Sequence, residues 1–350
     1  MKPPISVIVP TANRPHYLSN SLESISLQSR KDLILEVLVS ENSSNTDSKN
    51  IAEGFASALP IRWMHNIPNC TAQQHAIILA ATSQGTHIAL LADDDLWDRY
   101  HLEEAWRCFQ NHPEVVAYFG QTVCVDNQNC QPFSPFSGTF NHLLSQKNQD
   151  VKDFFLWDSS LTAVNSLTST PLNIWAGVIQ TEIHRKALEE ATGHPELGKL
   201  AANDSLYIWR LSTYGTLACG RHISLFYRVH SQSDLQSQAR EDHSKLKLDE
   251  LTIRKEIAQQ ALDLGSDPFA LWYHLMIRAA SQKLSHRIYK DDGVITQWLK
   301  KKLTEKDLVG LQETNNSLAI NRNVKSFILN LTPPVLAKLY RRTKKPKTSS

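Results

Sequence analysis

The sequence predicts an α/β protein in which a mixed, mostly parallel sheet is flanked by helices. Two observations lead to this fold class. Over the first hundred residues, four short apolar runs alternate with three stretches of helical periodicity. The apolar runs are rich in β-branched residues, which is typical of strands covered on both faces. Strands that alternate with helices in this way form a doubly wound sheet.

The elements of this first part follow from the pattern of residues. Ile5–Val9 is a continuous β-branched run that predicts a strand, and Pro10 ends it. We interpret Asn13 as the N-cap of a helix that begins at Arg14 and Pro15. Further strands are predicted at Glu36–Val39, Ile61–Met64 and His87–Leu91, and further helices at Asp47–Ala58 and Thr71–Thr82.

The pattern continues less regularly beyond residue 100. Helices are predicted at Leu102–Phe109, Thr181–Ala191 and Asp204–Tyr214, and strands at Val115–Val125, Ile174–Ile179 and Ile223–Val229. Residues 126–170 are rich in Asn, Gln, Ser and Pro and are too long for a simple connection, so we predict an active-site loop region there. From about Ser231 the sequence becomes helical and highly charged, which predicts a C-terminal helical extension.

Composition and charge restrict the classes of protein that remain. With 41% hydrophobic and 21% charged residues, the chain is expected to be soluble and globular. Its net charge of +2 gives no reason to expect a nucleic-acid partner. The five cysteines are scattered, so we expect no disulfide framework, no zinc site and a reducing cytoplasm. No run reaches the ~18 apolar residues that span a bilayer, so any membrane contact is expected to be peripheral, on the inner face.

Polar residues follow three of the predicted strands at the point where each strand ends. These groups are Thr11-Ala12-Asn13, Ser40-Glu41-Asn42 and Asp93-Asp94-Asp95. In open α/β sheets, ligands bind in the crevice outside the carboxyl ends of the strands. The sequence therefore predicts that residues far apart in the chain surround one site.

The three aspartates indicate a metal site within that crevice. Clustered carboxylates are hard oxygen ligands suited to Mg²⁺ or Mn²⁺, which can bridge a diphosphate and neutralise its charge. The alternative is an acidic turn, or a helix that starts near Trp97 and is capped by Asp95 or Asp98. Because two other polar groups are expected beside the cluster, we favour the metal site.

Five ordered motifs resemble those of the family 2 glycosyltransferases, which have the GT-A fold. They are ISVIVPTANRPHYLSNSLESISLQS, LEVLVSENSS, GTHIALLADDDLWDRYHLEEA, AANDSLYIWRLSTYG and ISLFYRVHSQS. The resemblance covers about residues 3–235 and implies inverting transfer of a sugar from a nucleoside diphosphate, with a divalent cation. It implies a GT-A catalytic domain over 1–235, while the composition beyond it predicts a helical region over 236–337 and a basic tail over 338–350.

The resemblance implies a role for individual residues. Thr11, Asn13, Glu41, Asp93 and Asp94 would bind the nucleotide sugar, with Glu41 accepting the imide N–H of the base. Asp94 and Asp95 would hold Mn²⁺ or Mg²⁺, with His230 as a third ligand, and Asp204 would be the catalytic base. Trp175 and Gly177 stand where such enzymes shape the acceptor pocket.

Each of these residues also has a purely structural interpretation. Asn13 would be only a helix cap, Glu41 a solvated turn residue and Asp204 a charge at a helix N-terminus. His230 would be a hydrogen-bonding residue at a strand end, Trp175 a core residue and Gly177 a site of close backbone approach.

Three positions depart from the family pattern. Ala92 stands where many relatives have the first aspartate of the acidic motif, and Asn203 replaces a frequent Glu before the base. The helix predicted at Thr71–Thr82 lacks an arginine that many relatives have, so a contact to the diphosphate would have to come from elsewhere.

The sequence thus predicts a glycosyltransferase that uses a UDP- or dTDP-sugar and Mn²⁺ or Mg²⁺. The acceptor is expected to be a hydroxyl of a glycan or lipid-linked glycan, in surface polysaccharide biosynthesis. One alternative, a metal-dependent nucleotidyl or phosphoryl transferase, should have a glycine loop after the first strand, and Thr11–Arg14 contains no glycine. The other is a non-catalytic carbohydrate-binding protein, against which the presence of Asp204 and the three aspartates argues.

Overall fold

The computed structural model describes most of the chain up to residue 268. The described residues are 3–44, 46–66, 70, 72–128, 130–135, 154–167, 172–193, 204–230, 243–268, 271 and 302. The chain divides into two compact units, Met1–Ile253 and Arg254–Ser350. About half of the predicted active-site loop, namely residues 129, 136–153 and 168–170, and the whole predicted basic tail lie outside the described residues. Among the residues that are described, no helix is long and apolar enough to cross a membrane.

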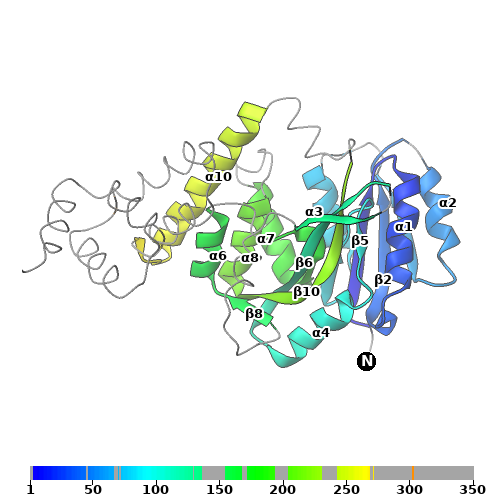
Figure 1. The fold of residues 1–350 in the computed structure, drawn as a ribbon, viewed down its shortest axis with the longest axis horizontal. Helices are drawn as coiled ribbons and strands as arrows, with labels where there is room; N and C mark the ends of the chain where they lie inside the picture. The colour runs from blue at the N-terminus through cyan, green and yellow to red at the C-terminus, as the bar shows by residue number, and fades with distance from the viewer. Residues whose placement is uncertain are drawn as a thin grey trace, which may run out of the picture. The chain divides into compact units, whose positions relative to one another are not determined.

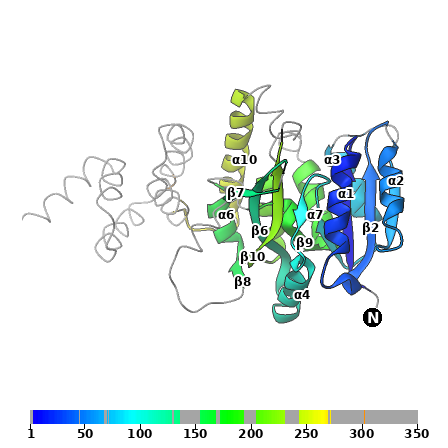
Figure 2. The ribbon, with the colours of Figure 1, turned by 45° about the vertical axis from the view of Figure 1, so that its right-hand side comes forward.

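The first unit is built on one mixed sheet, which Figures 1 and 2 show from two sides. The strands are β1 (Ile5–Thr11), β2 (Ile34–Glu41), β3 (Ile61–His65), β4 (His87–Leu90), β5 (Leu96–Trp97), β6 (Val115–Asp126), β7 (Pro132–Pro135), β8 (Phe154–Trp157), β9 (Gly177–Gln180) and β10 (Thr216–Val229). Their order is β3-β2-β1-β4-β9-β6-β10-β5, while β7 pairs with β6 and β8 with β10.

The direction of the strands explains how the polar groups come together. β1 runs parallel to β2 and β4, and β2 runs parallel to β3. β9 is antiparallel to both β4 and β6, and β10 is parallel to β6. The carboxyl ends of β1, β2 and β4 therefore lie at the same edge of the sheet. The predicted fold class, a mixed and mostly parallel sheet with helices, is confirmed.

Helices cover the sheet. They are α1 (Pro15–Ser26), α2 (Asp47–Gly54), α3 (Ala72–Thr82), α4 (His101–Asn111), α6 (Ser159–Ser166), α7 (Thr181–Gly193) and α8 (Asp204–Tyr214), with short 3₁₀ turns η1 (Lys31–Leu33) and η2 (Ile174–Ala176). A further helix, α10 (His243–Asp263), comes after β10 in the chain. α1 packs on α2 beside β2, as Figures 1 and 2 show. α3 packs on α7, α7 on α8, and α8 on α6, which forms a continuous helical layer.

The apolar residues of the central strands are buried, as the sequence pattern predicts. Ile5, Val7 and Val9 of β1 are fully buried, and Ile8, on the opposite face, is 2% exposed. A strand buried on both faces favours apolar side chains at nearly every position, which explains a run rich in β-branched residues, and its one polar side chain, Ser6, is satisfied by Glu36. Because both faces are covered, only the end of β1 is left to present polar groups to a ligand.

The interpretation of Asn13 as a helix N-cap is wrong. Arg14 is the N-cap residue of α1, and no side chain caps this helix end. Asn13 instead has a φ of 58°, and its backbone N–H donates to Glu41 Oε1 at 3.2 Å. Asn tolerates the left-handed region better than most residues, so the residue type suits a sharp turn as well as a cap. The turn directs the backbone of Asn13 toward the end of β2.

Several predicted boundaries also differ from the structure. The residues near Trp97 form strand β5, and the following helix begins only at His101. The predicted strand at Ile174–Ile179 starts as the 3₁₀ turn η2 and becomes a strand at Gly177. In each case a short tertiary pairing overrides the local pattern, since β5 pairs with β10, and β9 lies between β4 and β6.

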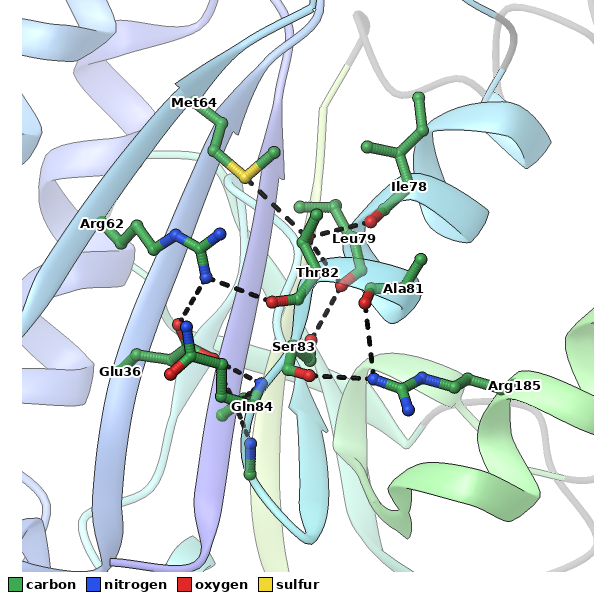
Figure 3. A network of polar contacts seen from close by, with 12 residues as sticks. Glu36, Arg62, Met64, Ile78, Leu79, Ala81, Thr82, Ser83, Gln84 and Arg185 are labelled. Atoms are coloured by element: carbon green, nitrogen blue, oxygen red, sulfur yellow. Dashed lines mark hydrogen bonds and ion pairs between the residues drawn. The ribbon is translucent and has the colours of Figure 1, made fainter.

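A network of polar contacts fixes the C-terminal end of α3 (Figure 3). Arg185 of α7 donates from Nε to the carbonyl of Ala80 and from one terminal nitrogen to the carbonyl of Ser83, both at 2.9 Å. Arg62 of β3 donates to the carbonyl of Thr82 at 3.1 Å and to the buried carboxylate of Glu36 at 3.0 Å. The last carbonyls of a helix have no partner within the helix, and two cations here satisfy them.

Arg185→Ala should therefore destabilise the fold, because it leaves carbonyls at the end of α3 without donors. Since the Arg185 side chain is one-third exposed, we expect a loss of about 1–2 kcal/mol in the free energy of unfolding. Urea denaturation of the full chain measures the loss. Arg30→Ala, which removes an exposed arginine paired only with Asp32, is the matched control and should change little. If both substitutions lower the free energy of unfolding equally, the Arg185 contacts with α3 stabilise the fold no more than an exposed ion pair does.

Candidate functional site

The ends of β1, β2 and β4 are joined by direct hydrogen bonds. Thr11 Oγ1 donates to Asp93 Oδ2 at 2.7 Å, which links the end of β1 to the turn after β4. The backbone N–H of Asn42 donates to the carbonyl of Thr11 at 2.9 Å, and that of Asn13 donates to Glu41 Oε1. The structure thus brings together the three polar groups that the sequence placed at strand ends.

Two residues from other elements hold the turn of aspartates in place. Ser21 of α1 donates from Oγ to the backbone carbonyls of Asp93 and Asp95, both at 2.7 Å. Arg228, near the end of β10, donates its backbone N–H to Asp95 Oδ1 and its Nε to the carbonyl of Asp94, both at 2.9 Å. The turn is therefore attached to a helix on one side and to the last strand of the sheet on the other.

Asp94 is the member of the turn with the closest charged neighbours. Arg14 contacts Asp94 Oδ2 at 2.5 Å from a terminal nitrogen and Asp93 Oδ2 at 3.4 Å from Nε. His230 Nε2 lies 3.0 Å from the same Asp94 oxygen. His230 follows Arg228 by two residues, so the attachment of Arg228 to the turn also brings His230 to Asp94. One carboxylate oxygen thus lies between an arginine and an imidazole.

Asp93 and Asp95 are both buried, with exposed fractions of 1% and 0%. Burial, opposed by Arg14 and reinforced by Asp94, raises the pKa of Asp93 to about 7. Burial and the Asp94 charge raise the pKa of Asp95 well above its ordinary value. Three carboxylates in a nearly dry turn repel one another, so the turn favours the arrival of positive charge.

Asp95 is not the cap of a nearby helix, which was the structural alternative for the acidic cluster. Its Oδ1 accepts from Arg228, and its Oδ2 is buried without a hydrogen-bond partner among the described residues. Asp98, not Asp95, stabilises the turn before the helix, because its Oδ1 accepts the backbone N–H of Tyr100 at 2.9 Å. The acidic cluster and the helix end are therefore separate features.

Glu41 is fully buried at the end of β2. Its Oε1 accepts the N–H of Asn13, whereas its Oε2 is buried and has no hydrogen-bond partner within the described residues. A solvated turn residue would be exposed, so that interpretation of Glu41 is wrong. A buried carboxylate oxygen without a donor is costly. This oxygen is a buried acceptor that no donor among the described residues satisfies.

A cavity of about 350 Å³ opens beside this edge of the sheet. Its walls come from the ends of β1 and β4, from α3, η2, α7 and the start of α8. Of the residues that the sequence singled out, Thr11, Asp93, Trp175 and Asp204 line the cavity. Asn13, Glu41, Asp94, Asp95, Gly177 and His230 do not line it, although all but Gly177 lie in or against the polar groups that border it.

Asp204 is the first residue of α8 and lines the cavity together with Thr11 and Asp93 of the strand-end groups. Burial raises the pKa of Asp204 to about 6. A carboxylate with such a pKa is ionised at neutral pH and still accepts a proton readily. Its preceding residue, Asn203, lies outside the described residues.

Of Trp175 and Gly177, only Trp175 lines the cavity. Trp175, in η2, lines the cavity and accepts a hydrogen bond from Trp97 Nε1 at its backbone carbonyl, 3.2 Å away. Gly177 begins β9, and a Cβ there would lie 2.8 Å from the carbonyl oxygen of Ile174 and 3.1 Å from the ring of Phe119. Gly177 is therefore required for close packing, as its structural interpretation predicts, while Trp175 faces the cavity.

Some residues of the site were not identified from the sequence. Arg14, Ser21 and Arg228 shape the acidic turn through contacts across long stretches of chain, which no local pattern records. His184 of α7 and Tyr207 of α8 line the cavity as a hydrogen-bonded pair. The only local signal that could have identified any of these residues was the position of Arg14, which directly follows a polar group at a strand end.

The described residues include no group of three or more His, Cys, Asp or Glu arranged to hold a metal ion. They do include a pair, Asp94 and His230, whose oxygen and nitrogen are ligands that Mn²⁺ accepts. Asp95 adds a buried oxygen without a partner in the described part of the chain. These donors fit a divalent cation whose remaining ligands come from a bound diphosphate.

Comparisons with known proteins agree with this geometry. Residues 6–160 match the model of glycosyl transferase family 2. No curated protein matches the chain. Staphylococcus aureus TarS 1–349 in complex with UDP-GlcNAc is 15% identical with a TM-score of 0.57, over 98% of this chain and 93% of that one. Another structure of TarS 1–349 is 16% identical with a TM-score of 0.52, over 84% of this chain and 78% of that one.

A further solved structure is the mannosyltransferase PcManGT from Pyrobaculum calidifontis in complex with GDP-Man and Mn²⁺. It is 14% identical with a TM-score of 0.50, over 93% of this chain and 83% of that one. At these identities the solved structures show only that the fold is similar. The family model, in contrast, matches the sequence itself over residues 6–160. Residues 6–160 are therefore a family 2 glycosyltransferase domain, and the predicted enzyme class, a glycosyltransferase, is confirmed.

Proposed function

We propose that this protein transfers a sugar from a nucleoside diphosphate to a hydroxyl group, with inversion at the anomeric carbon. The observation that carries the proposal is a single cavity lined both by Asp93, of the acidic turn, and by Asp204, at the start of α8. In a single displacement, the reacting carbon must lie between the departing diphosphate and the base that activates the acceptor. A cavity bounded by an acidic turn and a separate carboxylate suits this requirement.

The donor is a UDP- or dTDP-sugar in this proposal. Both bases carry an imide N–H, and the buried Glu41 Oε2 is an acceptor still without a donor among the described residues. Thr11 lines the cavity and contacts Asp93, and the backbone of Asn13 contacts Glu41 beside it. Arg14 supplies a cation beside the acidic turn, in place of the arginine that α3 lacks, and would contact the diphosphate.

A divalent cation, Mn²⁺ or Mg²⁺, would be held by Asp94 and Asp95, with His230 as a further ligand. When bound, such an ion neutralises negative charge that develops on the departing diphosphate. The chain's own contribution is to fix these ligands: Arg228 holds the backbone of the turn, and Ser21 holds two of its carbonyls. PcManGT, which has a similar fold, was solved with GDP-Man and Mn²⁺.

Asp204 is the general base in this proposal, and Trp175 forms part of the surface that receives the acceptor. The acceptor hydroxyl gives its proton to the Asp204 carboxylate while its oxygen bonds to the anomeric carbon, and the bond from that carbon to the diphosphate breaks. The acceptor would be a glycan or lipid-linked glycan in surface polysaccharide biosynthesis, and the enzyme would act in the cytoplasm.

The alternative of nucleotidyl or phosphoryl transfer receives no support from the turn after β1. That turn presents a side-chain oxygen, from Thr11, and the backbone of Asn13, rather than a glycine loop that cradles phosphates. A non-catalytic carbohydrate-binding protein would not need a carboxylate with a pKa of about 6 at the cavity wall. Both alternatives predict that no sugar is transferred or released from a sugar nucleotide.

Thermal unfolding tests the proposal directly. The full chain with Mn²⁺ is heated alone and with UDP, dTDP, GDP and their sugar derivatives. A ligand that binds only the folded state raises the unfolding temperature by mass action. We expect UDP or dTDP compounds to stabilise the protein more than GDP compounds, and the best sugar nucleotide to be slowly hydrolysed. If none of these compounds stabilises the protein, the proposed function is wrong.

The basic tail is proposed to dock on an anionic membrane surface. Leu336, Leu339 and Tyr340 stand beside six cationic residues, Lys338, Arg341, Arg342, Lys344, Lys345 and Lys347. Each such cation contributes about 1 kcal/mol near an anionic surface. The full chain should therefore sediment with anionic vesicles but not with neutral ones, and a chain truncated after Pro334 should not sediment with either. Equal sedimentation of the truncated chain would exclude a role for the tail.

A further inference from the structure

His184 and Tyr207 form a buried polar pair in the wall of the cavity. His184 lies on α7 and Tyr207 on α8, and their exposed fractions are 3% and 6%. Tyr207 Oη and His184 Nδ1 are 2.5 Å apart, and their rings meet edge to face with centroids 5.7 Å apart. Both residues line the same cavity as Asp93 and Asp204.

The surroundings of this pair are largely apolar. Leu79 of α3 and Leu188 and Ala191 of α7 line the cavity with it. Phenylalanine at position 207 would fill nearly the same volume without bringing a polar atom into an apolar wall, where polar groups are costly unless hydrogen-bonded. Packing alone therefore does not account for the choice of tyrosine and histidine.

The pair retains hydrogen-bonding capacity after its internal bond is made. Burial, and then the neighbouring Arg185, lower the pKa of His184 to about 4, so that its imidazole is neutral. If Tyr207 donates to Nδ1, the Nε2–H of His184 remains a donor and the phenol oxygen an acceptor. If Nδ1–H donates to Tyr207, the phenol O–H remains a donor and Nε2 an acceptor. With either tautomer, the pair has one donor and at least one acceptor left.

A sugar hydroxyl both donates and accepts hydrogen bonds, so it is suited to a pair that offers one donor and one acceptor. In the proposed reaction the donor sugar must lie between the acidic turn and Asp204, and Tyr207 is one helical turn after Asp204 on α8. We infer that the His184–Tyr207 pair binds a hydroxyl group of the donor sugar and so determines which sugar nucleotides are accepted. This inference rests on the proposed function and assigns two further residues to its specificity.

The test compares the binding of sugar nucleotides with that of the diphosphates alone. Calorimetry with the full chain and Mn²⁺ measures Kd for UDP, UDP-glucose, UDP-galactose, UDP-GlcNAc, dTDP, dTDP-glucose, GDP and GDP-mannose. For the sugar nucleotide that binds most tightly, Tyr207→Phe should raise Kd about five- to 100-fold, because a hydrogen bond to the sugar is lost. Kd for the corresponding diphosphate should stay within about two-fold, since the nucleotide does not contact the pair.

Two further variants make the result specific. His184→Asn shortens the other partner and should weaken binding of the same sugar nucleotide by a similar factor. Tyr214→Phe removes a hydroxyl from the same helix, where it bonds to Glu190 at the surface, and should change neither Kd.

The outcomes separate this inference from the proposed function. If the parent protein binds sugar nucleotides and Tyr207→Phe changes nothing, or weakens the diphosphate equally, the inference about the pair is wrong and the proposed function stands. If the parent protein binds no diphosphate and no sugar nucleotide, both fail together.

Discussion

Asp204→Asn is expected to lower the rate of sugar transfer by ~10²–10⁴, the usual contribution of one positioned general base. A sugar hydroxyl is a weak nucleophile at neutral pH, so a carboxylate must take its proton as the new bond forms. Asparagine has nearly the same shape as aspartate but cannot accept that proton. Binding of the donor should survive, because Asp204, at the start of α8, belongs neither to the acidic turn nor to the groups at the ends of β1 and β2 that are proposed to bind the donor.

The measurement is initial transfer rates at saturating donor, together with the donor Kd and the anomeric configuration of the product. Asp158→Asn is a matched control, since Asp158 is an exposed aspartate that caps α6 through Leu161. We expect the control to transfer sugar at close to the parent rate. Near-parent activity of Asp204→Asn would contradict the assignment of the base, and a product that keeps the donor configuration would contradict a single displacement.

The pH dependence of the transfer rate is an independent test of the role of Asp204 as the base. Burial raises the pKa of Asp204 to about 6, and the base acts only in its ionised form. The rate should therefore fall as the pH decreases through about 6 and be nearly constant above about 7, until another group titrates. In Asp204→Asn the residual rate should lack this acidic limb. A parent profile that is flat between pH 5 and 7 would contradict the role of Asp204.

The edge of the sheet that carries the site could be predicted from the sequence for a physical reason. Ile5–Val9 is apolar at four of its five positions, which indicates a strand buried on both faces, and such strands end at a common polar edge. Thr11, Glu41 and Asp93 are found at that edge because the parallel register of β1, β2 and β4 places them there. Strand pairing and residue type alone were enough to predict that these residues lie at one edge of the sheet.

The contacts that shape the site could not be predicted in the same way. Arg14 and Asp94 are separated by 80 residues, and Arg228 and Asp94 by 134. Neither contact follows from a helix or strand period. His184 and Tyr207 were placed on predicted helices, but the face of each helix that borders a cavity depends on how α3, α7 and α8 pack together. Asn13 shows the reverse case, in which a local propensity was interpreted as a helix cap, whereas the residue takes a left-handed conformation before the cap position.

Removal of divalent cations is expected to weaken binding of UDP or dTDP by about 100-fold or more, since a metal ion contributes several kcal/mol to binding the charge of a diphosphate. The acidic turn carries three carboxylates, of which two are buried, against the one guanidinium of Arg14 that contacts them. A diphosphate adds further negative charge at this point. Because burial raises the pKa values of Asp93 and Asp95, a divalent cation would both favour their ionised forms and neutralise the diphosphate, and its removal should weaken binding.

Calorimetry with the preferred diphosphate, in Mn²⁺ and in excess chelator, measures this effect. Asp94→Asn should reduce the difference between the two conditions, because Asp94 is the carboxylate that lies beside His230. Asp98→Asn is the matched control: Asp98 follows the same turn, but its side chain accepts the backbone N–H of Tyr100, so the substitution should leave the metal dependence unchanged. Equal affinity for the diphosphate in Mn²⁺ and in chelator would remove the metal from the mechanism and leave Arg14 as the cation at the acidic turn.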